Sequence, residues 1–116
     1  MSSKKDKSKN LEKYFMSIAM NLAKDRVGLT GLNPSVGCLI VKDNEIISFG
    51  QTGFKGRPHA EDVAIKKCSK SELKGATIFV TMEPCTHYGK TPPCANLIIK
   101  SRIKKVVYSI NDIDKR

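Results

Sequence analysis

The spacing of apolar residues along the chain predicts alternating helices and strands. Residues 11–25 carry apolar side chains at helical spacing, which is typical of an amphipathic helix. Residues 36–41 and 45–50 are short, apolar and rich in β-branched residues, as strands are, and Asp43-Asn44 between them tolerates the positive φ angles of a tight turn. The first part of the chain therefore predicts one helix followed by a β-hairpin.

The rest of the chain predicts helices and strands in alternation. An apolar repeat at helical spacing covers residues 60–68, and residues 77–82 are typical of a short buried strand. A further helix is predicted over residues 94–102 and a last strand within residues 103–110. Strands that are joined through helices lie parallel in one sheet whose faces the helices cover. We therefore predict an α/β fold with three layers, α/β/α, and a mixed sheet that combines the hairpin with parallel strands.

Length and composition suit a single domain. A chain of 116 residues that is 40% apolar can bury one modest core. No run approaches the roughly 20 apolar residues of a membrane span. Residues 1–10 carry four lysines with no apolar stretch behind them, so they predict a disordered basic tail rather than a secretory signal. The folded domain is expected over residues 11–116.

Cysteine content and net charge limit the environment and the partners. Without an export signal, the four cysteines are expected to be reduced thiols, which indicates a cytoplasmic protein. The net charge of +10 could attract a nucleic acid, but the lysines are scattered and no tryptophan is present to stack on an extruded base. The charge favours a phosphorylated small molecule, with neither nucleic acid nor a membrane as the partner.

Three side chains form a candidate metal site. His59, Cys85 and Cys94 would supply one imidazole and two thiolates, a set that suits Zn²⁺ and leaves a fourth position open, as in catalytic zinc sites. All three fall near the predicted carboxyl ends of strands, where sites in such sheets gather. Glu61, two residues after His59, would move a proton between an activated water and a leaving group. The set predicts a zinc-dependent hydrolytic site with Glu61 as its acid–base residue.

This combination resembles the zinc-dependent cytidine and deoxycytidylate deaminase superfamily. The eight residues between the two cysteines, which include Gly89 and Pro92-Pro93, are similar to those of the pyrimidine deaminase branch of riboflavin biosynthesis, and so are residues 33–38. The resemblance implies a cytidine-deaminase-like fold that lacks the family's last helix and strand in this chain. It also implies deamination of 2,5-diamino-6-ribosylamino-4(3H)-pyrimidinone 5′-phosphate to 5-amino-6-ribosylaminouracil 5′-phosphate.

The resemblance also implies substrate contacts. Asn33 would hold the pyrimidine edge, His87 would contact the substrate, and Lys90 would face its phosphate. Each has a simpler alternative, since Asn33 can form a turn before a proline and the other two can be solvated loop residues. Thr52 stands where relatives often carry a histidine that faces the substrate. We further expect a homo-oligomer, and a reductase domain or protein for the next step.

Three functions stay open on the sequence. The first is the riboflavin-precursor deaminase, the second is a deaminase of another base, including one in nucleic acid, and the third is a zinc-stabilised module without activity. Cys38 and Cys68 are expected to pack in the core rather than bind the metal. Glu83 is expected to anchor the backbone rather than to serve as a second acid. Ammonia release from alternative substrates separates the three functions.

Overall fold

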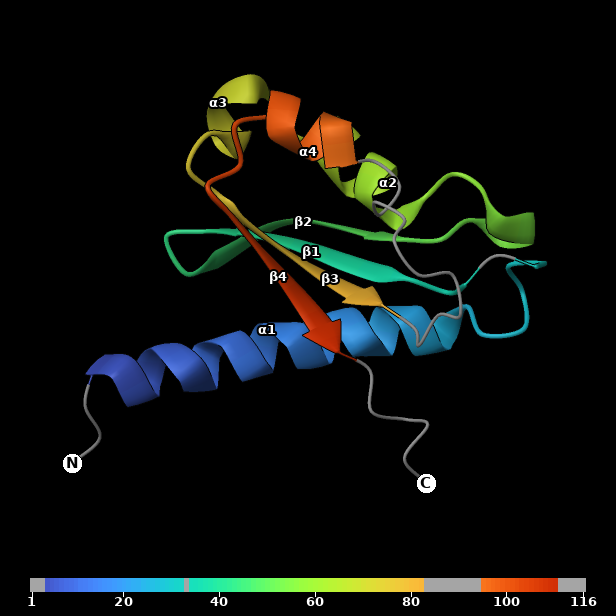
Figure 1. Cartoon of the computed structure of the whole chain (residues 1–116), viewed down its shortest axis with the longest axis horizontal. Coiled ribbons are helices and arrows are strands. Elements are labelled where there is room, and N and C mark those ends of the chain that lie inside the picture. Colours follow the sequence, from blue (N-terminus) through green and yellow to red (C-terminus); the bar gives the residue numbers. More distant parts are fainter. Residues whose placement is uncertain (1–3, 33, 83–94, 111–116) are drawn as a thin grey trace.

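The computed structural model describes residues 4–32, 34–82 and 95–110. Helices and strands alternate along the chain, as predicted (Figure 1). The elements are α1 (Lys4–Asp25), β1 (Gly37–Lys42), β2 (Glu45–Gln51), a short 3₁₀ turn η1 (Phe54–Gly56), α2 (Ala60–Lys66), α3 (Lys70–Leu73), β3 (Thr77–Met82), α4 (Ala95–Lys100) and β4 (Lys105–Ile110).

The described strands form a mixed sheet of four in the order β2-β1-β3-β4. β1 runs antiparallel to both of its neighbours, whereas β3 and β4 are parallel. β2, β3 and β4 therefore point the same way. β2 and β3 flank the α2–α3 connection without being neighbours, because β1 lies between them. The hairpin prediction is confirmed at its turn, where Asp43 and Asn44 have φ angles of 52° and 65°.

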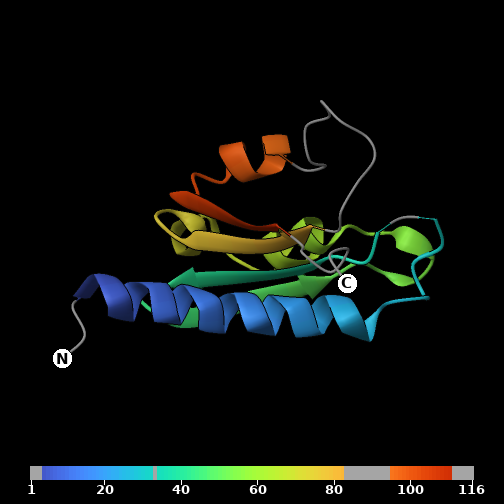
Figure 2. The ribbon, with the colours of Figure 1, turned by 60° about the horizontal axis from the view of Figure 1, so that its bottom comes forward.

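Helices cover both faces of the sheet and give the predicted three layers (Figures 1 and 2). α1 packs Phe15 and Ala19 against Phe79 on one face. The other face meets α2, α3 and α4 through a second cluster that includes Ala64 and Ile98. Successive strand residues point to opposite faces, so a central strand such as β1 is buried on both faces from Gly37 to Val41, and its last residue, Lys42, is partly exposed. Each large apolar side chain buried in this way contributes about 1.5–3 kcal/mol to folding.

Two glycines let the helices lie directly on the sheet. A Cβ on Gly50 of β2 would overlap the carbonyl oxygen of Ala60 in α2. A Cβ on Gly37 of β1 would overlap the carbonyl oxygen of Ala19 in α1 on the opposite face. The first turn of α2 is therefore held against the backbone of β2, which fixes its place relative to the sheet.

Residues 4–10 continue α1 instead of forming the disordered tail that the sequence predicted. The segment contains neither glycine nor proline, and lysine is a good helix former, so the helix can propagate toward the N-terminus. Nearby, Lys105 of β4 donates a hydrogen bond to Glu12 at 2.6 Å.

None of the helices in the described part of the chain has the length and apolar content that crossing a membrane requires.

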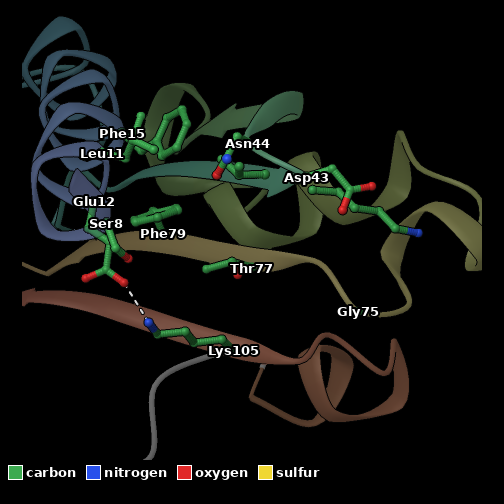
Figure 3. A pocket seen from close by; sticks show the side chains of 12 residues that line it. Ser8, Leu11, Glu12, Phe15, Asp43, Asn44, Gly75, Thr77, Phe79 and Lys105 are labelled. Carbon is green, nitrogen blue, oxygen red and sulfur yellow. Dashed lines mark hydrogen bonds and ion pairs between the residues drawn. The ribbon is translucent and has the colours of Figure 1, made fainter. Parts of the chain in front are cut away.

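A cavity of about 220 Å³ lies between α1 and the sheet (Figure 3). Phe15 and Phe79 line it, and the ion pair between Glu12 and Lys105 crosses one side. Thr77, the first residue of β3, also lines it. The cavity therefore lies at the opposite end of the sheet from the carboxyl ends of β2 and β3.

Candidate functional site

His59 and Glu61 lie where the chain passes from β2 into α2. The connecting loop is closed by a hydrogen bond from the Gly53 N–H to the Pro58 carbonyl oxygen, at 2.9 Å. His59 has an extended backbone (φ −72°, ψ 152°) and is the N-cap of α2, and Glu61 is the second residue of the helix. The predicted placement of both residues at the first helical turn is confirmed.

The Glu61 side chain is buried, although carboxylates seldom are. The residue is 5% exposed, whereas the next carboxylate in the helix, Asp62, is half-buried. Burial raises the pKa of Glu61, and a backbone hydrogen bond at the helix start and the nearby His59 partly oppose this rise. A raised pKa makes a carboxyl group a better proton acceptor, which is the direction that acid–base catalysis by a carboxylate requires.

The carboxyl ends of β2 and β3 lie at one edge of the sheet. Gln51, the last residue of β2, pairs with Gly37, and Val80 of β3 pairs with Cys38, the next residue of β1. α4 lies in the crossover between β3 and β4 and is in contact with α2. The remaining predicted site residues lie outside the described residues, so their roles stay predictions: Asn33, Cys85, His87, Lys90 and Cys94.

The donor chemistry of the predicted set fits zinc. Within the described ranges, no three His, Cys, Asp or Glu side chains gather as a metal site, because the predicted set takes two of its three ligands from residues 83–94. His59 is only half-buried and can offer an imidazole at the sheet edge. Cys38 and Cys68 instead pack in the cluster beneath α2, as predicted. An imidazole with two thiolates is a zinc set, and it leaves a position for water.

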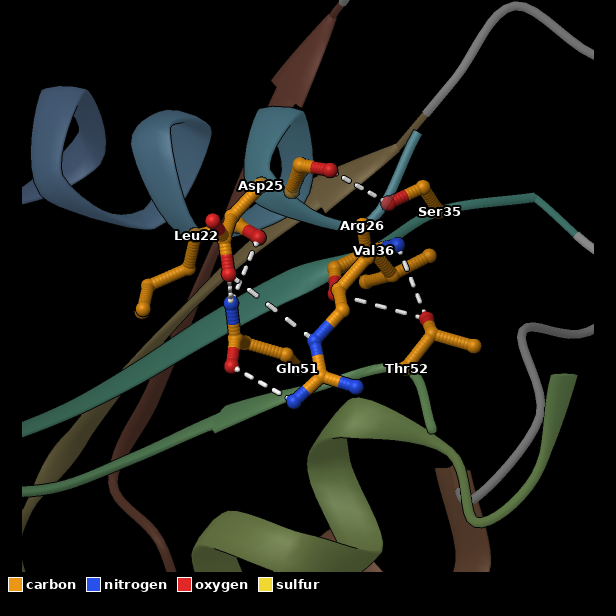
Figure 4. Close-up of polar contacts among 8 residues, drawn as sticks. Leu22, Asp25, Arg26, Ser35, Val36, Gln51 and Thr52 are labelled. Atoms are coloured by element: carbon orange, nitrogen blue, oxygen red, sulfur yellow. Dashed lines mark hydrogen bonds and ion pairs between the residues drawn. The ribbon is translucent and has the colours of Figure 1, made fainter. Parts of the chain in front are cut away.

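The end of β2 is also tied to the C-terminal turn of α1 (Figure 4). The Gln51 side-chain amide donates to the Leu22 carbonyl oxygen at 3.0 Å and to Asp25 Oδ2 at 2.9 Å. Its oxygen accepts a hydrogen bond from Arg26 at 3.2 Å. The Arg26 guanidinium lies over the Phe54 ring, 4.2 Å from its centroid, in the loop that leads to α2. This network holds the start of that loop against α1.

Hydroxyl groups hold the segment of residues 34–37, and sequence reasoning missed this role. Ser35 donates to a carbonyl at the end of α1, and the N–H groups of Val36 and Gly37 donate to Thr52 and Thr81. Thr52 was expected at a substrate-facing position, but it is 1% exposed and bonded inside the fold. Hydroxyl-to-backbone bonds leave no residue pattern, so the sequence carried no signal for Thr81.

The chain matches the family model of the cytidine and deoxycytidylate deaminase zinc-binding region over residues 9–110. It belongs to this family. The match confirms the family that the motifs resembled, and it confirms zinc as the family's metal. The fold agrees, since the solved structures of similar deaminases share it.

Within this family, the chain is similar to proteins of riboflavin biosynthesis. It is 45% identical to the riboflavin biosynthesis protein RibD of Aquifex aeolicus (strain VF5) over 104 residues, which cover 90% of this chain and 29% of RibD. The Thermotoga maritima diaminohydroxyphosphoribosylaminopyrimidine deaminase/5-amino-6-(5-phosphoribosylamino)uracil reductase superposes with a TM-score of 0.72 at 48% identity, covering 85% of this chain and 29% of that one. The chain thus spans less than a third of the length of these relatives.

A second class of deaminase has a similar fold. Guanine deaminase from Bacillus subtilis superposes with a TM-score of 0.64 at 34% identity, covering 84% of this chain and 62% of that one. The fold is therefore shared by deaminases of different bases. The choice of substrate depends on residues around the site rather than on the fold.

Proposed function

We propose that this chain catalyses the zinc-dependent hydrolytic deamination of 2,5-diamino-6-ribosylamino-4(3H)-pyrimidinone 5′-phosphate in riboflavin biosynthesis. The observation that carries the proposal is the buried Glu61 two residues after His59 at the start of α2. The 45% identity to RibD supports this choice of substrate within the deaminase family. The products would be 5-amino-6-ribosylaminouracil 5′-phosphate and ammonia.

Each residue of the motif has a distinct role in the proposed reaction. His59, Cys85 and Cys94 would hold zinc, which supplies a Lewis acid that lowers the pKa of water. Glu61 takes a proton from the attacking water and returns it to the amino nitrogen of the pyrimidine. The carbon–nitrogen bond breaks, a carbonyl takes its place, and the nitrogen leaves as ammonia. Water is the only co-reactant.

Three further residues would select the substrate. The Asn33 amide offers one acceptor and two donor hydrogens, which suits the edge of a pyrimidine. His87 would provide a further contact, and Lys90 would place a positive charge near the ribose phosphate. The net charge of +10 supports a substrate that carries a phosphate dianion.

The names of the relatives indicate that a reductase acts on the product of the deamination. The Thermotoga maritima protein is named as both a deaminase and a reductase, and this chain covers 29% of it. We therefore expect a reductase domain or a separate reductase to use the product. A cytoplasmic location fits the two thiolate ligands, which must stay reduced. We also propose that this chain forms a homo-oligomer.

The test is ammonia release by the zinc-loaded chain. The riboflavin precursor is compared with cytidine, dCMP, guanine and a tRNA stem-loop, and guanine is included because of the likeness to guanine deaminase. We expect ammonia from the riboflavin precursor alone. Faster release from another base would replace the proposed substrate. Zinc binding without release from any substrate would favour a zinc-stabilised module.

A further inference from the structure

Three hydroxyl groups from three parts of the fold hold residues 34–37. Ser35 Oγ donates to the Ala23 carbonyl oxygen near the end of α1. The next residue, Val36, donates its N–H to Thr52 Oγ1 at 2.9 Å, just after β2 (Figure 4). Gly37 donates its N–H to an oxygen of β3, Thr81 Oγ1, also at 2.9 Å. This segment is thus attached to α1, β2 and β3 at consecutive residues.

The Thr52 hydroxyl is used entirely inside the fold. It accepts the Val36 N–H, and it lies 3.4 Å from the carbonyl oxygens of both Pro34 and Val36, to which it can donate. The Thr52 N–H also donates to the Val36 carbonyl oxygen at 3.0 Å. A hydroxyl group has one proton to give, so Thr52 has no proton for a substrate while it holds this segment.

Thr81 bridges the point where β1 and β3 separate. The pairing of these strands includes Cys38 with Val80 as its last pair toward this edge. At the next residue, the Gly37 N–H bonds to the Thr81 side chain instead of a backbone carbonyl. Val36 packs against the cluster that contains Ala60, the first residue of α2. The anchored segment therefore adjoins the same core cluster on which α2 packs.

We propose that Thr52 and Thr81 are positioning residues that fix the Pro34–Gly37 backbone for substrate binding without touching the substrate. The inference rests on the proposed function, because the segment follows Asn33, the proposed contact to the pyrimidine. A preorganised backbone avoids the entropy cost of ordering this segment when the substrate binds. The two hydroxyls thus act on substrate affinity, and the chemical step is left to Glu61.

The experiment compares valine and serine at each position. Thr52→Val and Thr81→Val keep the shape of the side chain and remove the hydroxyl, whereas Thr52→Ser and Thr81→Ser keep the hydroxyl. Thr77→Val, at the far end of β3, is the matched control. On the zinc-loaded chain, amide hydrogen exchange is measured by NMR at Val36 and Gly37. For the same variants we measure KM and kcat with the riboflavin precursor. We also measure the Kd of the product.

The expected result is a local loosening with a matching loss of affinity. Thr52→Val should speed exchange at Val36 about 3- to 10-fold, as expected for one lost hydrogen bond, and raise KM and the product Kd by a similar factor. Its kcat should stay within about twofold, since Glu61 is untouched. Thr81→Val should speed exchange at Gly37 and raise KM and the product Kd by similar factors. Both serine variants and Thr77→Val should match the parent.

Three results would overturn the inference. Unchanged exchange at Val36 in Thr52→Val would mean that the hydroxyl does not hold the segment. Faster exchange with unchanged KM and Kd would mean that the anchor serves folding alone. If Thr52→Val does not fold, a Thr52→Ser variant that differs from the parent in KM would also contradict the inference. A parent chain that neither deaminates the precursor nor binds the product contradicts the proposed function instead, and the exchange rates still decide whether the hydroxyls hold the segment.

Discussion

At the scale of single residues, the fold isolates one carboxyl group from water. Glu61 and Asp62 are neighbours in the first turn of α2, yet only Glu61 is buried. Taking a carboxylate out of water costs free energy, and the proposed acid–base role would account for this cost. The helix start offsets part of the cost, because unpaired N–H groups and the helix dipole favour a negative charge there.

Replacement of Glu61 should separate metal binding from catalysis. Glu61→Gln keeps the size and the hydrogen bonds of the side chain but cannot accept a proton. Deamination should therefore fall at least about 10²-fold while the zinc content stays near one per chain. Asp62→Asn is the matched control and should keep its activity, whereas His59→Ala should lose zinc. Turnover of Glu61→Gln within a few-fold of the parent would move the proton transfer to another group, with Glu83 as the first candidate.

Removal of the Lys90 charge should affect only the phosphorylated substrate. A charge-assisted contact to the phosphate is worth about 1–3 kcal/mol, so Lys90→Ala should raise KM roughly 5- to 150-fold for the precursor. The dephosphorylated analogue lacks the group and should keep its KM. Steady-state kinetics on both substrates check this. Equal losses on both would indicate damage to the segment that carries Cys94, and no loss would make Lys90 a solvated residue.

At the scale of elements, segments with an apolar pattern or turn residues were predicted well, and a four-residue helix without such a pattern was missed. The hairpin around Asp43-Asn44 and the strand over residues 77–82 agree with the structure because apolar runs and turn residues are local signals. α3 was missed, since four residues show no period. Its capping box was a usable signal: the Ser69 N–H donates to Glu72 at 2.7 Å and the Glu72 N–H returns a bond to Ser69 at 3.1 Å. The early start of α1 was also missed, because lysines favour helix and solvated tail alike.

The same contrast holds for the candidate site. The placement of His59 and Glu61 at the start of α2 could be predicted, because the apolar repeat of the helix that follows is a local signal. Their roles in metal binding and proton transfer stay predictions. The anchoring role of Thr52 and Thr81 could not be predicted, because any backbone N–H can be the partner of a hydroxyl and strands favour threonine anyway. The sequence therefore indicates which residues are candidates for the chemistry, but it does not indicate which hydroxyl groups hold the neighbouring backbone in place.

The packing of α2 on β2 should control the site through Gly50. In Gly50→Ala, the new methyl group would overlap backbone atoms of Ala60, so α2 must move away and stability should fall by about 1–3 kcal/mol or more. Gly37→Ala creates a similar overlap with α1 on the opposite face, and it is a control for kcat alone, because Gly37 belongs to the segment that is proposed to act on KM. Both variants should have a lower melting temperature than the parent. At a temperature where both are folded, only Gly50→Ala should also lose kcat, and equal kcat in both would contradict a role for this contact in placing Glu61.

At the scale of the whole molecule, strand direction brings the carboxyl ends of β2 and β3 to one edge of the sheet. β2, β3 and β4 point the same way, so Gln51 at the end of β2 and Met82 at the end of β3 lie at the same end of the sheet. The cavity beneath α1 lies at the other end, beside the start of β3. The lysines are not concentrated in one segment but occur along the whole chain. A diffuse excess of +10 attracts polyanions without specifying a binding surface.

This charge distribution predicts weak and salt-sensitive binding to nucleic acid, without chemistry on it. A short RNA stem-loop should bind with a Kd of about 10⁻⁴–10⁻⁶ M at physiological salt. If about two to four phosphates are neutralised, affinity should fall roughly 10- to 100-fold between about 50 and 200 mM salt. Fluorescence anisotropy over a salt series measures both, with a scrambled stem-loop as the control for sequence preference. Tight binding that survives 200 mM salt, a preference for one sequence, or ammonia release from the RNA would favour a nucleic-acid deaminase, because each needs specific contacts that scattered lysines do not supply.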